Sequence, residues 1–171
     1  MKKLLFFLSV IFLFVGCDES TVPPEKTFSM PQAVDTSQTK QETINLTIKT
    51  IGNTMSDIAF DPKEIVVPVN SKVKITLTNE SQGEEMNHNI VFIKMGTGDE
   101  VAREGLAIGA KKNYIPDNPN VIAGSEIALP GQTVQLQFNA PKAGSYHYIC
   151  TFPGHYPQMI GRMKVVVETF P

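Results

Sequence analysis

The chain has 171 residues, of which 42% are hydrophobic and 19% charged, and its formal net charge is −2. That length allows one domain with appended segments, and the balance of residue types is ordinary for a globular protein. The nearly neutral chain has neither a basic patch nor a glycine-rich phosphate loop, which excludes the usual signatures of nucleic-acid binding.

Residues 1–16 have the composition of an export signal. Two lysines precede an apolar run of twelve residues, Leu4–Val15. The run is too short for a membrane span, which needs about 20 apolar residues, and the absence of a polar face disfavours a buried helix. The following FVGC resembles a bacterial lipobox, with Phe14 where leucine is usual. We therefore predict a signal peptide over 1–16 and lipidation of Cys17, with ordinary signal cleavage as the alternative.

The segment from Asp18 to Gln41 is rich in Ser, Thr, Pro, Gln and charged residues. Such a composition cannot build a core, so we predict that residues 17–41 are an anchor cysteine followed by a flexible tether. A coil of this length spans about 25–30 Å. The sequence thus predicts an exported domain, periplasmic or at the cell surface, held to a bacterial membrane by lipid.

A period-two pattern begins near Glu42. Ile44, Leu46 and Ile48 share one face of a predicted strand, and similar alternation recurs along the chain. The candidate strands are INLTIKT, EIVVPV, VKITLTN, HNIVFI, TVQLQFN, SYHYIC and RMKVVVE. Seven or eight such strands, separated by turn signals, indicate an all-β Greek-key sandwich over residues 42–171.

One segment departs from this pattern. Residues 97–112, TGDEVAREGLAIGAKK, predict one short helix inserted in the sandwich. Thr97 and Glu100 have the spacing of a capping box, and lysines stand at the expected last turn. Gly105 and Gly109 weaken the helix by up to ~1 kcal/mol each.

Three metal-ligand side chains fall within ten residues, in CTFPGHYPQM. Cys150 ends a predicted strand, and the prolines and glycine that follow predict a tight loop that can bring His155 and Met159 to the same point. If Cys17 carries lipid, Cys150 has no disulfide partner, and an unpaired thiol outside the cytoplasm needs an explanation. The alternative is that each residue is an ordinary part of the core.

A fourth ligand would come from a neighbouring strand. Strand alternation places His147 on the face opposite Cys150, toward solvent, so His88 is the better second imidazole. Two imidazoles, one thiolate and a weak thioether match the blue-copper arrangement used for electron transfer. Zinc is the competing metal, because cysteine and histidine also bind zinc, and Met159 argues against it.

With these ligand residues, the chain resembles azurin, of the cupredoxin family. YICTFPGHYPQMIGRMKVVV is similar to the C-terminal copper loop of azurins, MNHNIVF to the segment with the first histidine ligand, and GNTMSDIAFDPKEIVV to the N-terminal strands. The resemblance covers about residues 44–168. It implies a cupredoxin sandwich with one copper ion, cycling between Cu(I) and Cu(II).

The resemblance also implies individual roles. His88, Cys150 and His155 would be the equatorial copper ligands and Met159 the axial one. The backbone carbonyl of Asn87, where azurins have glycine, would be a weak fifth contact. Asn89 would join the two ligand loops near the thiolate, and the amide of Phe152 would donate to the sulfur. Asn79 lies near the place of a buried pH-sensing histidine found in many azurins, so no such pH coupling is expected.

The expected function is electron transfer with redox proteins such as a c-type cytochrome, a reductase or an oxidase. We expect the ring edge of His155 to reach the surface within a small apolar docking patch, whose other members are Met86, Pro153, Gly154, Tyr156 and Pro157. The alternative for the patch is a scatter of ordinary exposed residues. A copper carrier is the alternative function. An enzyme is not expected, because Met159 closes the site to substrate.

Overall fold

The computed structural model describes residues 41–167, all within the second of the two units into which the chain divides, Gln38–Pro171. The predicted signal peptide and Cys17 lie outside the described residues, and so does the tether apart from Gln41. No helix within residues 41–167 is long and apolar enough to cross a membrane.

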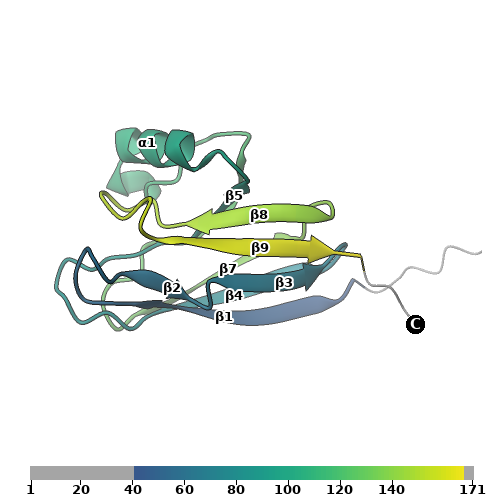
Figure 1. Cartoon of the computed structure of the whole chain (residues 1–171), viewed down its shortest axis with the longest axis horizontal. Coiled ribbons are helices and arrows are strands. Elements are labelled where there is room, and N and C mark those ends of the chain that lie inside the picture. The colour runs from purple at the N-terminus through teal and green to yellow at the C-terminus, as the bar shows by residue number, and fades with distance from the viewer. Residues whose placement is uncertain (1–40, 168–171) are drawn as a thin grey trace, which may run out of the picture. The chain divides into compact units, whose positions relative to one another are not determined.

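Two sheets pack face to face in the described part (Figure 1). The first sheet has the order β2-β1-β4-β7 and the second the order β3-β9-β8-β5-β6, with parallel pairs β1–β4 and β3–β9. The strands are β1 (Thr43–Ile51), β2 (Ala59–Asp61), β3 (Glu64–Pro68), β4 (Lys72–Asn79), β5 (Val91–Lys94), β6 (Val121–Gly124), β7 (Thr133–Asn139), β8 (Gly144–Ile149) and β9 (Ile160–Val166). The predicted all-β sandwich is therefore confirmed.

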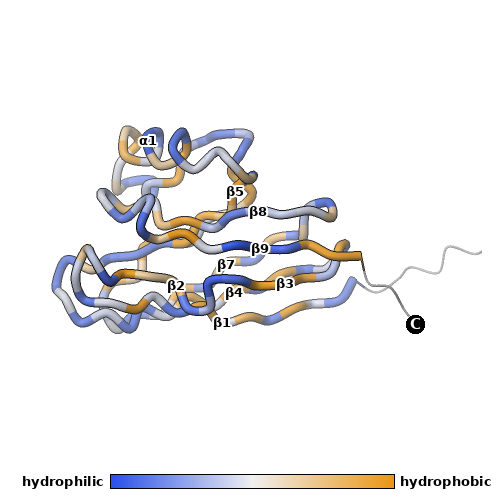
Figure 2. The backbone as a smooth tube through the Cα atoms, viewed as in Figure 1, coloured by the Kyte–Doolittle hydropathy of each residue, from blue (hydrophilic) through white to orange (hydrophobic). Residues whose placement is uncertain are grey.

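The core follows from the alternation in the sequence. Figure 2 shows polar and apolar segments alternating along β1. In β4 the inward side chains Val73, Ile75 and Leu77 are fully buried. Burying each such side chain stabilises the fold by about 1.5–3 kcal/mol, so the period-two pattern determines which face of the strand turns inward.

The sequence predicts seven of these nine strands and misses two, β2 and β6. β2 has only three residues, and every residue of β6 is half-buried, so neither shows a period-two pattern. Both lie at sheet edges, where pairing depends on the neighbouring strand rather than on the strand's own residues.

The inserted helix α1 (Gly98–Ile108) packs on the outer face of the second sheet (Figure 1), where Val101 lies against Val91, Ile93 and Ile149. The predicted capping box is wrong. The Thr97 hydroxyl donates to the Lys94 carbonyl instead.

The other partner of the expected box, Glu100, is occupied elsewhere: its carboxylate accepts from the side chain of Asn118 at 2.9 Å. The prediction that lysines occupy the last turn of the helix is also wrong. They belong to a separate 3₁₀ turn, η1 (Ala110–Lys112), because Gly109 ends α1 with φ +79°.

Candidate metal centre

The loop between β8 and β9 is folded on itself by three backbone hydrogen bonds. The amide of Cys150 donates to the Met159 carbonyl at 3.2 Å, that of His155 to Phe152 at 3.1 Å, and that of Met159 to His155 at 2.9 Å. Gly154 allows the turn because it adopts φ +83°, which residues with a side chain rarely do. As a result Cys150, His155 and Met159 are all buried, at 0%, 1% and 0% exposed.

His88 comes from the segment before β5 and is fully buried. It forms a two-way backbone bridge with Ala128, with N–O distances of 3.1 and 2.7 Å. Its Nε2 lies 3.3 Å from the Ser81 hydroxyl, which leaves Nδ1 to face the cysteine. Partners of this kind orient a histidine ligand and select its tautomer.

Three potential ligand atoms converge at this point. Nδ1 of His88 lies 3.1 Å from Nδ1 of His155, and Sγ of Cys150 lies 3.9 Å from the first and 3.5 Å from the second. All three side chains are buried, and their ligand atoms lie within 4.8 Å of one another. The two-imidazole, one-thiol set predicted from the sequence is thus assembled in space, by residues 62 and 67 positions apart.

Burial determines the protonation of this group when no metal is bound. It lowers the pKa of His88 to about 3, helped by the nearby His155, and that of His155 to about 4. Burial also raises the pKa of the Cys150 thiol to about 12. The two imidazoles are therefore neutral at physiological pH and each offers a lone pair, while the thiol needs a cation to ionise.

Such a donor set fits a single soft or borderline metal ion. Imidazole nitrogen and thiolate sulfur are ligands of both copper and zinc. Met159 follows on the same loop and is fully buried, in keeping with a thioether contact to copper. Asn87, just before His88, is half-buried, and its Oδ1 is the one buried side-chain oxygen or nitrogen within residues 41–167 that has no hydrogen-bond partner.

Asn89 joins the two ligand-bearing segments. Its Oδ1 accepts from the Thr151 amide and its Nδ2 donates to the Thr151 hydroxyl, both at 2.8 Å, and Nδ2 also donates to the Asn113 carbonyl at 2.7 Å. The backbone amides of Asn89 and Phe152 point to the Cys150 sulfur and partly offset the effect of burial on its pKa. These two donors stabilise the ionised form of the sulfur.

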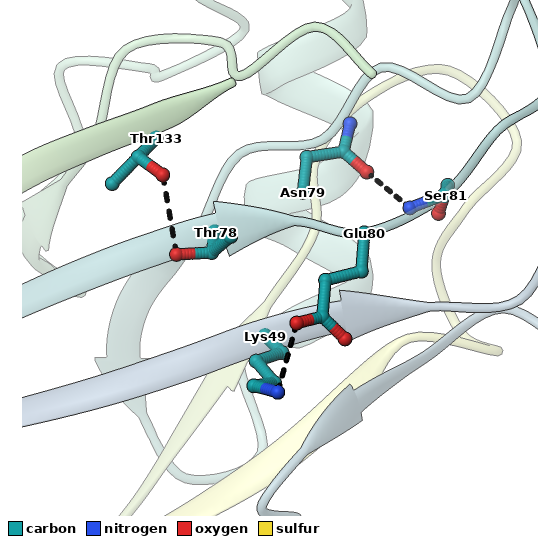
Figure 3. Close-up of polar contacts among 6 residues, drawn as sticks. All are labelled: Lys49, Thr78, Asn79, Glu80, Ser81 and Thr133. Carbon is teal, nitrogen blue, oxygen red and sulfur yellow. Dashed lines mark hydrogen bonds and ion pairs between the residues drawn. The ribbon is translucent and has the colours of Figure 1, made fainter. Parts of the chain in front are cut away.

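A second asparagine, Asn79, is hydrogen-bonded to the segment that precedes His88. Asn79, at the end of β4, is 1% exposed and uses its whole amide. Its Oδ1 accepts from the Thr50 hydroxyl at 2.9 Å and the Ser81 amide at 3.0 Å, and its Nδ2 donates to the carbonyls of Met86 at 2.7 Å and Ala128 at 2.9 Å. Figure 3 shows the contact with Ser81.

Sequence analysis missed the part that Ser81 plays. It stands in the turn NESQG, where serine is ordinary, so only the fold shows that it lies beside a histidine. The partial signal was Asn79, which the resemblance had already placed at a functional position.

The residues of the predicted docking patch differ in exposure. Gly154 and Pro157 are exposed, and Met86, Pro153 and Tyr156 half-buried. Pro153, Gly154 and Tyr156 line a cavity of about 230 Å³ beneath α1, together with Ala102, Arg103, Leu106, Thr151 and Phe152, whereas Met86 and Pro157 do not.

Two expectations about histidines are wrong. The ring of His155 does not reach the surface, since the residue is only 1% exposed and the Phe152 ring packs on it with a centroid distance of 5.0 Å. His147 lies on the sheet face opposite Cys150, as expected from parity, but it is half-buried rather than solvated, and burial lowers its pKa.

Comparisons with known proteins agree with this geometry. The family model for copper binding proteins of the plastocyanin/azurin family matches residues 46–168. Auracyanin-A of Chloroflexus aurantiacus is 41% identical over 118 residues, which are 67% of this chain and 72% of that protein. Azurin-1 of Alcaligenes xylosoxydans xylosoxydans is 33% identical over 115 residues, 63% of this chain and 88% of that protein.

Solved structures give the same result. Auracyanin A, a blue copper protein from Chloroflexus aurantiacus, matches with a TM-score of 0.66 and 37% identity over 72% of this chain and 99% of that one. Dithionite-reduced auracyanin from Roseiflexus castenholzii matches with a TM-score of 0.64 and 32% identity, over 71% of this chain and 96% of that one.

Proposed function

Because the chain belongs to the plastocyanin/azurin family of copper-binding proteins, whose members are electron-transfer proteins, we propose that it shuttles single electrons between redox partners near a membrane. Its cofactor is copper. The observation that carries the proposal is the buried trio His88, Cys150 and His155, whose ligand atoms lie within 4.8 Å of one another. When bound, copper supplies a one-electron couple between Cu(I) and Cu(II).

The protein's own groups keep the ligands in place while the charge changes. His88, Cys150 and His155 would hold the copper ion, with Met159 as a further, weaker ligand. Each sits in a segment fixed by backbone hydrogen bonds, and all four are buried, so water is excluded. A rigid, dry ligand set suits both oxidation states and limits the reorganisation that accompanies electron transfer.

The outer groups have separate proposed tasks. The amides of Asn89 and Phe152 donate toward the sulfur of Cys150, which favours the thiolate over the thiol. Ser81 and the Ala128 bridge orient the imidazole of His88. The carbonyl of Asn87 is proposed as a weak additional contact, next to the unpaired side-chain oxygen of the same residue.

The same burial disfavours the two other functions. A copper carrier exchanges its metal with a partner, which requires accessible and labile ligands, whereas His155 and Met159 are 1% and 0% exposed. An enzyme needs an open position for substrate at the metal. The proposed Met159 contact would close that position, so we propose that the protein catalyses no reaction of its own.

The partners and the location also belong to the proposal. We propose that Cys17 carries lipid, that the domain is held at a bacterial membrane in the periplasm or on the cell surface, and that it exchanges electrons with a c-type cytochrome, a reductase or an oxidase. The support is the signal-like composition of residues 1–16. Replacing Cys17 by serine should release the protein from the membrane fraction, and continued sedimentation with membranes would contradict the anchor.

The electron-transfer proposal is tested by spectroscopy of the copper-loaded protein. An intense blue thiolate-to-copper band and narrow copper hyperfine splitting in EPR are expected. The Cys150→Ser variant should lose the band. His147→Ala is the matched control, since it removes a histidine three residues away on the opposite sheet face and should leave the colour unchanged. A colourless or easily stripped copper complex would reject the function.

A further inference from the structure

A second cavity lies away from the metal centre, along strands β3, β9 and β8 of the second sheet. It has a volume of about 430 Å³ and is lined by Lys63, Glu64, His147, Ile160, Gly161 and Arg162. Three of these six residues carry cationic or basic side chains, whereas Ile160 and Gly161 supply an uncharged wall. Neither the copper ligands nor the resemblance to azurin assigns a role to it.

Backbone pairing brings the basic residues together. The amide of Arg162 donates to the Lys63 carbonyl at 2.8 Å, and in the parallel pair β3–β9 Arg162 stands beside Glu64, the residue that follows Lys63. In the antiparallel pair β8–β9, Arg162 stands directly opposite His147. Directly opposed residues of an antiparallel pair project on the same face of the sheet, so the guanidinium and the imidazole share this cavity.

The positive charge of the cavity is not cancelled by its one acid. The carboxylate of Glu64 already pairs with the ammonium of Lys164 at 2.8 Å, and both side chains are nearly half exposed. Within residues 41–167, neither Lys63 nor Arg162 forms an ion pair. Because Glu64 is already engaged with Lys164, it neutralises Lys63 and Arg162 less, and the lining keeps a net positive charge.

The third basic group responds to these charges. Burial lowers the pKa of His147, and the nearby guanidinium of Arg162 lowers it further. On the other side of β8, the residue of β5 that is paired with His147 is the uncharged Ile93. At neutral pH the imidazole therefore offers a neutral N–H donor, and a bound anion would favour its protonated form.

We propose that this cavity is a binding site for a phosphate-type oxyanion. The forked guanidinium of Arg162 suits two oxygens of a tetrahedral anion, the ammonium of Lys63 adds a compact positive charge, and His147 donates through its ring. The site is separate from the copper function, since His147 projects from the sheet face opposite Cys150. The anion can be free in solution or be the headgroup of a lipid, and the two share this chemistry.

The ring of His147 is itself the reporter of binding. NMR of the reduced, diamagnetic Cu(I) protein would follow its ring resonances during addition of inorganic phosphate, with sodium chloride at equal ionic strength as the comparison. A saturable shift and a higher pKa of His147 in phosphate are expected. A shift that does not saturate, or that chloride reproduces, would overturn the site.

Variants distinguish this site from general charge attraction. Arg162→Gln and Lys63→Gln should each weaken phosphate binding by roughly fivefold. Lys74→Gln, on β4 of the other sheet, removes the same charge and should leave binding unchanged, whereas Glu64→Gln should not weaken it. Equal weakening by Lys74→Gln and Arg162→Gln would reject a localised site.

The source of the anion is decided by a sedimentation experiment. Cosedimentation with vesicles containing phosphatidic acid, reversed by free phosphate and lost in Arg162→Gln, would assign the site to a lipid headgroup. Saturable phosphate binding without vesicle binding would assign it to a soluble phosphate compound.

Discussion

Replacing Asn79 by alanine is expected to destabilise the copper-free protein by about 3–4 kcal/mol, although Asn79 is hydrogen-bonded to no proposed copper ligand. The amide is 1% exposed and makes four side-chain hydrogen bonds of 2.7–3.0 Å. Each such bond contributes about 1 kcal/mol net, and its loss leaves the carbonyls of Met86 and Ala128 buried without this partner. These carbonyls flank His88 and its backbone bridge, so the loss weakens the support of a ligand.

Urea unfolding followed by circular dichroism measures this effect. With a slope of about 1.5 kcal/mol per molar urea, the midpoint should fall by about 2 M. Thr78→Ala is the matched control on the same strand, because its hydroxyl makes only an exposed contact with Thr133 at 3.2 Å (Figure 3). It should change stability by less than about 0.5 kcal/mol. If Asn79→Ala costs less than about 1 kcal/mol, the buried amide does not support the loop as reasoned.

Three further outcomes are expected of the copper-free protein. The Cys150 thiol should react with alkylating reagents about 1000-fold more slowly than an ordinary thiol at pH 8, because its pKa is raised from 9.0 to about 12 and the residue is fully buried. Peptide mass spectrometry would measure the rate of this labelling. Stability should fall as the pH drops below 6.5, because the unfolded histidines protonate there while burial lowers the folded pKa of His88 to about 3 and that of His155 to about 4. The slope is up to about 1.4 kcal/mol per pH unit for each histidine, measured by denaturant titration at several pH values. Gly105→Ala should lower Tm although alanine favours helices, because the added Cβ would overlap the Tyr114 carbonyl oxygen.

Each expectation has a result that contradicts it. Rapid labelling of Cys150 would mean that the loop opens freely. A stability that is flat between pH 7 and 5 would mean that the two histidines do not control it. An increase of Tm in Gly105→Ala would mean that helix propensity outweighs the overlap. Leu106→Ala is the control for the helix, because its side chain is 58% exposed and its loss should change Tm little.

Alternation is long in β1 and β4, and in β4 every second residue is buried, so the sequence predicts these strands from their own residues. The resemblance to azurin and the copper cofactor are confirmed by the family model and the relatives. The helix α1 does begin after Thr97, but its capping box was mispredicted, because the spacing of the motif does not reveal that Asn118 competes for the carboxylate of Glu100. A short motif indicates which hydrogen bonds are possible, and the surrounding fold determines which of them form.

Sequence by itself determined the chemistry of the candidate centre. The residue types and the spacing of Cys150, His155 and Met159 are covalent facts, and a loop restricted by proline and glycine brings them near one another in any sandwich that pairs β8 with β9. Strand parity also favoured His88 over His147 as the second imidazole. Only the tertiary structure decided how deeply the set is buried and what surrounds it. His88 meets the loop through a contact with Cys150, 62 residues away in the sequence, and Ser81 and Asn79 hold the His88 segment in turn. The burial of His155 depends on the Phe152 ring packed against it. Such contacts, and the desolvation that shifts the pKa values, depend on neighbours that no local pattern specifies.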